Sequence, residues 1–137
     1  MEVLSSFAAE PVDSCTNGSK ITQWSSASTS DNLRWHFSNS RTTTGYYEIV
    51  SQKSGLDAVV QGASTSAGAG IIQWSFGSSG DDQWKAIANG DGSFTFYNLN
   101  SGMVLEDPGS STSTSTQMDQ WTANGGANQK WVLIRTN

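Results

Sequence analysis

The six tryptophans of this 137-residue chain occur as three pairs that recur at nearly equal spacing. The first members of the pairs are Trp24, Trp74 and Trp121, and the second members are Trp35, Trp84 and Trp131. First members are 50 and 47 residues apart, and second members are 49 and 47 residues apart. Such a repeat is typical of a fold assembled from a few similar units.

Each unit contains four short apolar segments separated by turn residues, as in "FTFYNL", "MVLE", "TQMDQW" and "QKWVLI" of the third unit. Their length and their aromatic and β-branched content predict strands, and we find no periodic segment of helix length. Three units, at about residues 1–40, 41–89 and 90–137, give about twelve strands in a single domain. The pattern predicts an all-β closed barrel with three-fold pseudo-symmetry, because closure removes exposed strand edges.

The first unit is shorter than the other two. "YEIVSQKSG" (47–55) aligns with "FTFYNLNSG" (94–102) without a gap, but "MEVL" (1–4) aligns with "GMVL" (102–105), which leaves nothing for the preceding strand. We therefore expect the first strand of unit one to be missing or truncated. The final segment "WVLIRTN" is expected to lie beside the resulting gap.

Composition excludes several classes of function. Only 14% of the residues are charged and the formal net charge is −5, so the chain lacks the basic surface that nucleic acids and anionic membranes require. No apolar run approaches the ~20 residues of a membrane span. The single Cys15 cannot form an intramolecular disulfide, and the N-terminus does not resemble a signal peptide. We nevertheless expect a secreted, extracellular protein, and any export signal to have been removed or never to have belonged to this piece.

No catalytic constellation is found. None of the twelve acidic residues lies in an apolar setting that would give it the raised pKa of a general acid. The only histidine, His36 in "RWHF", has no nucleophile or acid in a matching order, and no metal-ligand or phosphate-loop spacing occurs. We expect no enzymatic activity, no metal and no cofactor.

The repeated units resemble the ricin B-chain-like β-trefoils, and among them the carbohydrate-binding modules appended to bacterial glycoside hydrolases. The resemblance rests on "IVSQKSG", "VLEDPGSSTSTSTQMDQW" and "GGANQKW", where Gln129 and Trp131 form the Gln-x-Trp signature of the family. Asp82 and Leu33 replace the signature glutamine in units two and one, and the paired cysteines of the classical repeat are absent. The chain therefore resembles the cysteine-poor branch, and the resemblance implies a β-trefoil fold.

The two tryptophans of each pair are expected to have different roles. Trp35, Trp84 and Trp131 each begin an apolar segment, so we assign them to the core. Trp24, Trp74 and Trp121 precede polar loops that cannot bury both faces of an indole. The resemblance implies that they form the aromatic platforms of sugar sites, where an indole stacks on the apolar face of a sugar ring.

The polar partners that the resemblance implies differ among the units. In unit three the strand-end acidic position is Glu106, followed by Asp107, and the amide position is Asn128, followed by Gln129. In unit two Val59 occupies the acidic position and Asp81 the amide position, and Asp57 could substitute only if the strand register slipped. In unit one the equivalents are Ser5 and Asn32. Since carboxylates accept strong hydrogen bonds from hydroxyls, unit three is the best candidate site.

The function expected from these features is non-catalytic carbohydrate binding that targets an attached catalytic domain to polysaccharide. Galactose-, xylose- and arabinose-type sugars all remain open as ligands. A free-standing lectin is the alternative. A β-trefoil protease inhibitor, acting through "EPVDSC" or "FGSSGDD", is a further alternative that would not explain the repeated tryptophans.

Overall fold

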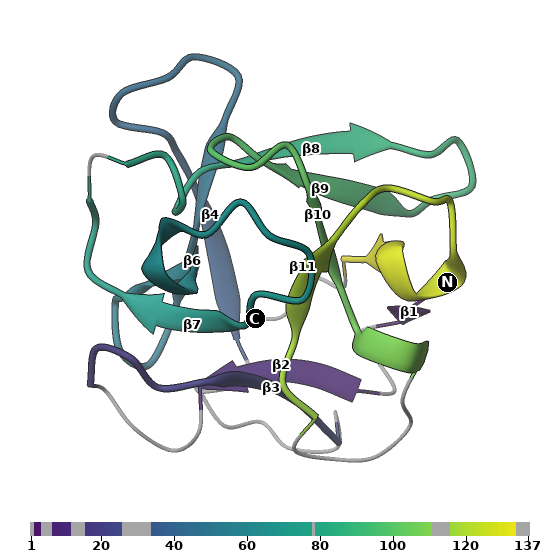
Figure 1. Ribbon diagram of the computed structural model, residues 1–137, viewed down its shortest axis with the longest axis horizontal. Coiled ribbons are helices and arrows are strands. Elements are labelled where there is room, and N and C mark those ends of the chain that lie inside the picture. The colour runs from purple at the N-terminus through teal and green to yellow at the C-terminus, as the bar shows by residue number, and fades with distance from the viewer. Residues whose placement is uncertain are drawn as a thin grey trace.

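The computed structural model describes residues 2–3, 7–11, 16–25, 34–77, 79–110 and 116–133. In these ranges the regular elements are strands and three short 3-10 helices (Figure 1). The strands are β1 (Glu2–Val3), β2 (Phe7–Pro11), β3 (Ile21–Ser25), β4 (Trp35–Asn39), β5 (Tyr47–Ser51), β6 (Asp57–Val60), β7 (Ile71–Trp74), β8 (Trp84–Ala88), β9 (Phe94–Asn98), β10 (Val104–Glu106), β11 (Asp119–Trp121) and β12 (Trp131–Val132). The helices are η2 (Gln61–Ala63), η3 (Pro108–Ser110) and η4 (Ala127–Gln129). The all-β prediction is confirmed.

The strand pairing repeats in each third of the chain. The two middle strands of each unit form an antiparallel pair, namely β2–β3, β6–β7 and β10–β11. The outer strands connect the units, because β4 pairs with β5, β8 pairs with both β5 and β9, and β9 pairs with β12. Figure 1 shows the β8–β9 ribbon and the β2–β3 ribbon at opposite sides of the molecule. This is the pattern of a β-trefoil.

The second members of the middle pairs meet around the pseudo-three-fold axis. Isolated bridges join Lys20 to Ile72, Gly70 to Asp119, and Gln117 to Thr22, so that each unit touches the next in a cycle. Three buried apolar side chains lie at this junction and belong to one core cluster: Ile21, Ile71 and Met118. The backbone NH of Met118 donates to Ile21 O, and that of Ile71 donates to Met118 O.

Unit one begins differently from the sequence alignment. Its first strand, β1, is truncated to two residues and runs parallel to β12, where Glu2 pairs with Trp131. The expectation that the last strand lies beside this position is therefore met by a short parallel pairing. The alignment of residues 1–4 with 102–105 is wrong, however, because Ala8 lies opposite Trp24 as Val104 lies opposite Trp121.

Candidate functional site

The two tryptophans of a pair divide as the sequence predicts in units two and three. Trp84 is 0% exposed and Trp131 is 3% exposed. Their indole NH groups donate to Ala58 O at 2.9 Å and to Leu105 O at 3.1 Å, on the middle strand pair of the same unit. Trp35, of unit one, is partly buried and packs against the core.

The first tryptophans of units two and three are the largest exposed aromatic side chains that the structure describes. Trp74 is 45% exposed and Trp121 is 42% exposed, and each is the last residue of its strand. Trp24 is the last residue but one of β3, and its side chain lies outside the described part of the structure. At least two indoles are thus available to stack on a ligand.

A buried glutamine precedes each exposed tryptophan and fixes the strand end. Ser101 Oγ donates to Gln120 Oε1 at 2.7 Å, and the Gln120 amide donates to Ser64 O and Ser66 O of unit two. In unit two, Ser54 Oγ donates to Gln73 Oε1 at 2.8 Å. This contact spans 19 residues in both units and was not predicted from the sequence.

A glycine of the preceding unit lies close to each indole. A Cβ placed on Gly18 would lie 3.5 Å from Trp74 Cζ3, and one placed on Gly68 would lie 3.7 Å from Trp121 Cζ3. Both glycines have positive φ and donate their backbone NH to the glutamine carbonyl before the tryptophan. Each platform therefore belongs to one unit and is bordered by its predecessor. In the loop at residues 63–70, which contains Gly68, residues 65–68 are exposed.

The predicted acid and amides of unit three come together beside this platform. Glu106, at the end of β10, is 5% exposed. Its Oε2 accepts from Gln129 Nε2 at 3.1 Å and from Asn128 Nδ2 at 3.5 Å. Gln129 also donates to Thr122 O and accepts from the backbone NH of Asn124. These bonds join the strand end, helix η4 and the loop that follows Trp121.

Asp107 and Asp119 add negative charge next to Glu106. Asp107 is buried, and its backbone NH donates to Asn128 O. Asp119 pairs with Glu106 across β10 and β11. Burial raises the pKa of Asp119 to about 7, with further contributions from hydrogen bonding to Glu106 and from the charges of Glu106 and Asp107. Asp119 was not predicted as a site residue. Its position two residues before Trp121 is the only signal in the sequence that could have identified it.

Val59 occupies the acidic position of unit two, as the sequence predicts. The register of β6 and β7 matches that of β10 and β11. Val59 lies opposite Ile72, two residues before Trp74, just as Glu106 lies opposite Asp119. Asp57 therefore does not take the acidic position and is instead 1% exposed. Asp81 is partly buried after the loop that follows Trp74, with its backbone O accepting from Asn98 Nδ2.

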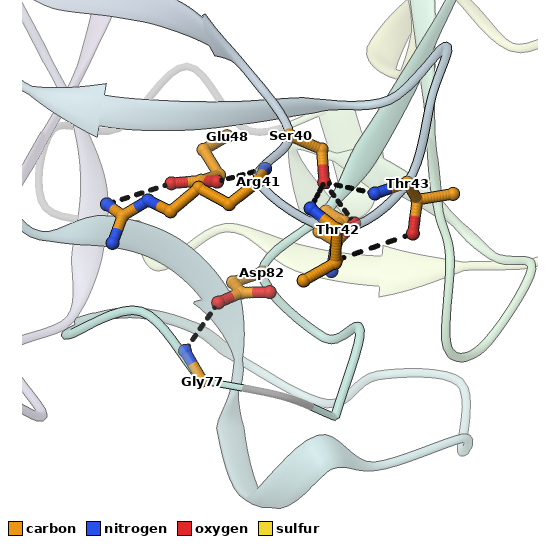
Figure 2. A network of polar contacts seen from close by, with 8 residues as sticks. Ser40, Arg41, Thr42, Thr43, Glu48, Gly77 and Asp82 are labelled. Carbon is orange, nitrogen blue, oxygen red and sulfur yellow. Dashed lines mark hydrogen bonds and ion pairs between the residues drawn. The ribbon is translucent and has the colours of Figure 1, made fainter.

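Asp57 belongs to a buried acidic cluster with Glu48 and Asp82. Burial raises the pKa of Asp57 to about 7, followed by the charges of Glu48 and Asp82, while Arg41 opposes the shift. Figure 2 shows Arg41 alongside Glu48, at 3.1 Å between Nη2 and Oε1, with Asp82 near them and bonded to the backbone NH of Gly77. The expectation that no acidic residue would have a raised pKa is therefore wrong for Asp57 and Asp119, because burial was not visible in the sequence. Neither the cluster nor Arg41 was predicted from the sequence.

Unit one provides a correction at its acidic position. Glu10 lies opposite Thr22, two residues before Trp24, and therefore corresponds to Glu106. The assignment of Ser5 to this position is wrong, because it followed from the incorrect alignment of the N-terminal segment. Ser5, Cys15 and Asn32 lie outside the described residues.

Among the described residues, no group of three or more His, Cys, Asp or Glu side chains could hold a metal ion. The described part of the chain also has no helix long and apolar enough to cross a membrane.

Comparisons with known proteins agree with this geometry. A model of the "Ricin-type beta-trefoil lectin domain-like" family matches residues 5–74, 31–121 and 80–137. None of the curated proteins compared with the chain matches it. The designed three-fold symmetric protein ThreeFoil is 33% identical, with a TM-score of 0.89, over 97% of this chain and 94% of its own.

Two natural proteins also contain this fold. An exo-β-1,3-galactanase from Clostridium thermocellum, 1,3Gal43A, is 28% identical with a TM-score of 0.90, over 97% of this chain but only 28% of its own length. The Rhizoctonia solani agglutinin, at 16% identity and a TM-score of 0.83, covers 97% of this chain and 89% of its own and shows similarity of fold alone. Together with the family match over all three units, these findings establish that the chain belongs to the ricin-type β-trefoil lectin-like domain family.

Proposed function

We propose that this domain binds carbohydrate without catalysing a reaction, and that unit three carries the principal site. One observation carries the proposal: Trp121 is 42% exposed on the unit in which Gln129 and Asn128 orient the carboxylate of Glu106. An indole face accepts the C–H face of a sugar ring, and an oriented carboxylate accepts hydrogen bonds from its hydroxyls. Asn128 and Asp107 complete the polar side of the proposed site.

We further propose that the domain directs an attached enzyme to polysaccharide. The galactanase supports this idea, because the part similar to our chain is 28% of that enzyme. A free-standing glycan-binding lectin is the alternative, in line with the family description. Galactose-type ligands are the first to test, and xylose- and arabinose-type ligands follow. The proposed setting is extracellular, where polysaccharide substrates occur.

Titration calorimetry with galactose-, xylose- and arabinose-containing oligosaccharides tests the proposal, using the wild-type protein, Trp121→Ala and Ile87→Ala. Ile87 is an exposed apolar residue of β8 and serves as the matched control. Trp121→Ala should weaken binding at unit three by about tenfold, since a stacked aromatic contributes on the order of 0.5–1.5 kcal/mol beyond the area that it buries. Full binding by Trp121→Ala, or no binding of any sugar by the wild type, would overturn the assignment of this site.

A further inference from the structure

Unit two presents an exposed indole with a different set of polar groups around it. The shared register places Val59 where unit three has Glu106. Asp81 and Asp82 then stand where unit three has Asn128 and Gln129, because both pairs lie three and two residues before the tryptophan that begins the last strand of their unit. Unit two therefore has no carboxylate at the strand-end position, and it has acids at both amide positions.

Asp82 repeats half of the bonding of Gln129. Asp82 Oδ2 accepts from the backbone NH of Gly77 at 2.8 Å, as Gln129 Oε1 accepts from Asn124. The other oxygen of Asp82 therefore falls where Gln129 has its amide nitrogen, which in unit three points to the acidic position of the site. Among the described residues, this Oδ1 is buried without a hydrogen-bond partner. A buried acceptor without a partner is a costly feature, and in Asp82 it belongs to the residue that directly follows Asp81 in the chain.

The negative charge under Trp74 is only partly compensated. Glu48 and Asp57 are buried next to Asp82, and Asp57 Oδ2 also has no hydrogen-bond partner among the described residues. Arg41 is the cation whose charge acts on Asp57, but it is paired with Glu48 and stacked 4.3 Å above the centre of the Phe76 ring. Burial and the charge of Asp82 raise the pKa of Asp81.

We propose that the Trp74 site of unit two binds an amino sugar, with the protonated amine at Asp81 and the sugar ring on the indole. This inference rests on the proposed function and extends it to a second class of ligand. A glucosamine-type residue offers both an apolar ring face and an ammonium group, so that one ligand matches the exposed indole and the uncompensated charge. Unit three has acids of its own, but the neutral Asn128 occupies the position of Asp81 and donates with Gln129 to the carboxylate of Glu106, so we keep unit three as the site for neutral sugars.

The test uses the Trp121→Ala variant, so that binding at unit three does not mask unit two. Calorimetric titrations with a glucosamine hexamer, its N-acetylated counterpart, a galacturonate oligomer and calcium chloride compare the alternative occupants. The glucosamine hexamer should bind about fivefold more tightly than the N-acetylated hexamer, with an affinity that falls as salt rises. Asp81→Asn, which installs the residue type of unit three, should abolish this preference.

Asp91→Asn is the matched control, because it removes one negative charge from an exposed residue of the β8–β9 turn, outside the Trp74 site. It should leave the preference for glucosamine intact. Circular dichroism and thermal unfolding confirm that Asp81→Asn is folded, and Trp74→Ala supplies a second variant that should also remove binding.

Three results would overturn the inference. These are equal binding of the charged and acetylated hexamers, tighter binding of galacturonate or calcium, and an unchanged preference in Asp81→Asn. Each of them leaves neutral-sugar binding by the wild type untouched. Absence of neutral-sugar binding in the wild type, in contrast, would count against the proposed function and not against the amino-sugar site.

Discussion

The side chain of Gln129 connects three parts of the unit-three site. Its amide donates to Glu106 Oε2 and to Thr122 O, and its oxygen accepts from the backbone NH of Asn124. All of these contacts are made with 1% of the residue exposed. The glutamine of the Gln-x-Trp signature therefore orients the acid of the site from behind, and the neighbouring Asn128 is the more accessible of the two amides.

Replacing Gln129 by leucine tests this role. Leucine has a side chain of similar volume but cannot form hydrogen bonds. The variant therefore removes the Gln129 partner of the Glu106 carboxylate, of Thr122 O and of the Asn124 NH group. We expect a loss of about 2–4 kcal/mol in the free energy of unfolding, together with weaker binding to neutral sugars. Urea denaturation and sugar titration measure the two effects. Gln52→Leu, in an exposed turn, is the control, and equal stability of both variants would contradict the assigned role.

At the scale of elements, the middle strand pairs carry the site and their register decides which residues face it. Glu10 could not be assigned from the sequence. Counted between equivalent paired residues, the loop between β2 and β3 is one residue shorter than the loop between β10 and β11, so only the pairing of the strands fixes the alignment. The serine–glutamine contacts, by contrast, left a visible signal. Ser101 and Gln120 are 19 residues apart, as are Ser54 and Gln73, and this constant offset reflects a contact between a turn and a middle strand of one unit.

Ser101→Ala should loosen the end of β11 that carries Trp121. Ser101 Oγ donates to Gln120 Oε1 at 2.7 Å and accepts from the backbone NH of Met103 at 3.1 Å. Loss of both bonds should lower the free energy of unfolding by about 1–2 kcal/mol. Hydrogen exchange at the amide of Gln120 should become faster in the variant. Ser66→Ala, at an exposed loop position, should change neither quantity, and a similar effect of both substitutions would count against the contact.

At the scale of the whole molecule, the repeat of tryptophans and the four short apolar segments of each unit predicted a three-fold all-β barrel, and the family resemblance implied a β-trefoil. Residues at equivalent positions of a repeat have equivalent environments. The residues that follow each tryptophan therefore allowed us to predict which indoles of units two and three are buried and which are exposed. The electrostatics of the sites could not be predicted in this way. Asp57 lies between apolar neighbours in the sequence, and only the packing of β5, β6 and the loop before β8 brings Glu48 and Asp82 to it.

The buried carboxylates make stability depend on pH in a defined direction. The pKa values of Asp57 and Asp119 are raised to about 7 in the folded protein, from an ordinary value of 3.8. Between these values the folded state holds protons that the unfolded state has released. The free energy of unfolding should therefore fall as pH rises from about 4 to about 7, and this contribution should level off above the folded pKa values.

Urea denaturation at about pH 5 and about pH 8 measures this slope. The wild-type midpoint should be lower at the higher pH. Asp57→Asn and Asp119→Asn should each flatten the difference, and the double variant should flatten it further, because an amide keeps the neutral form at every pH. Asp91→Asn should leave the slope unchanged. Hydrogen bonds from Ser93 are the main cause that lowers the pKa of the exposed Asp91, so this carboxyl group titrates below the pH range of the experiment. A wild-type protein that is equally stable at both pH values would show that neither carboxyl group holds its proton near neutrality.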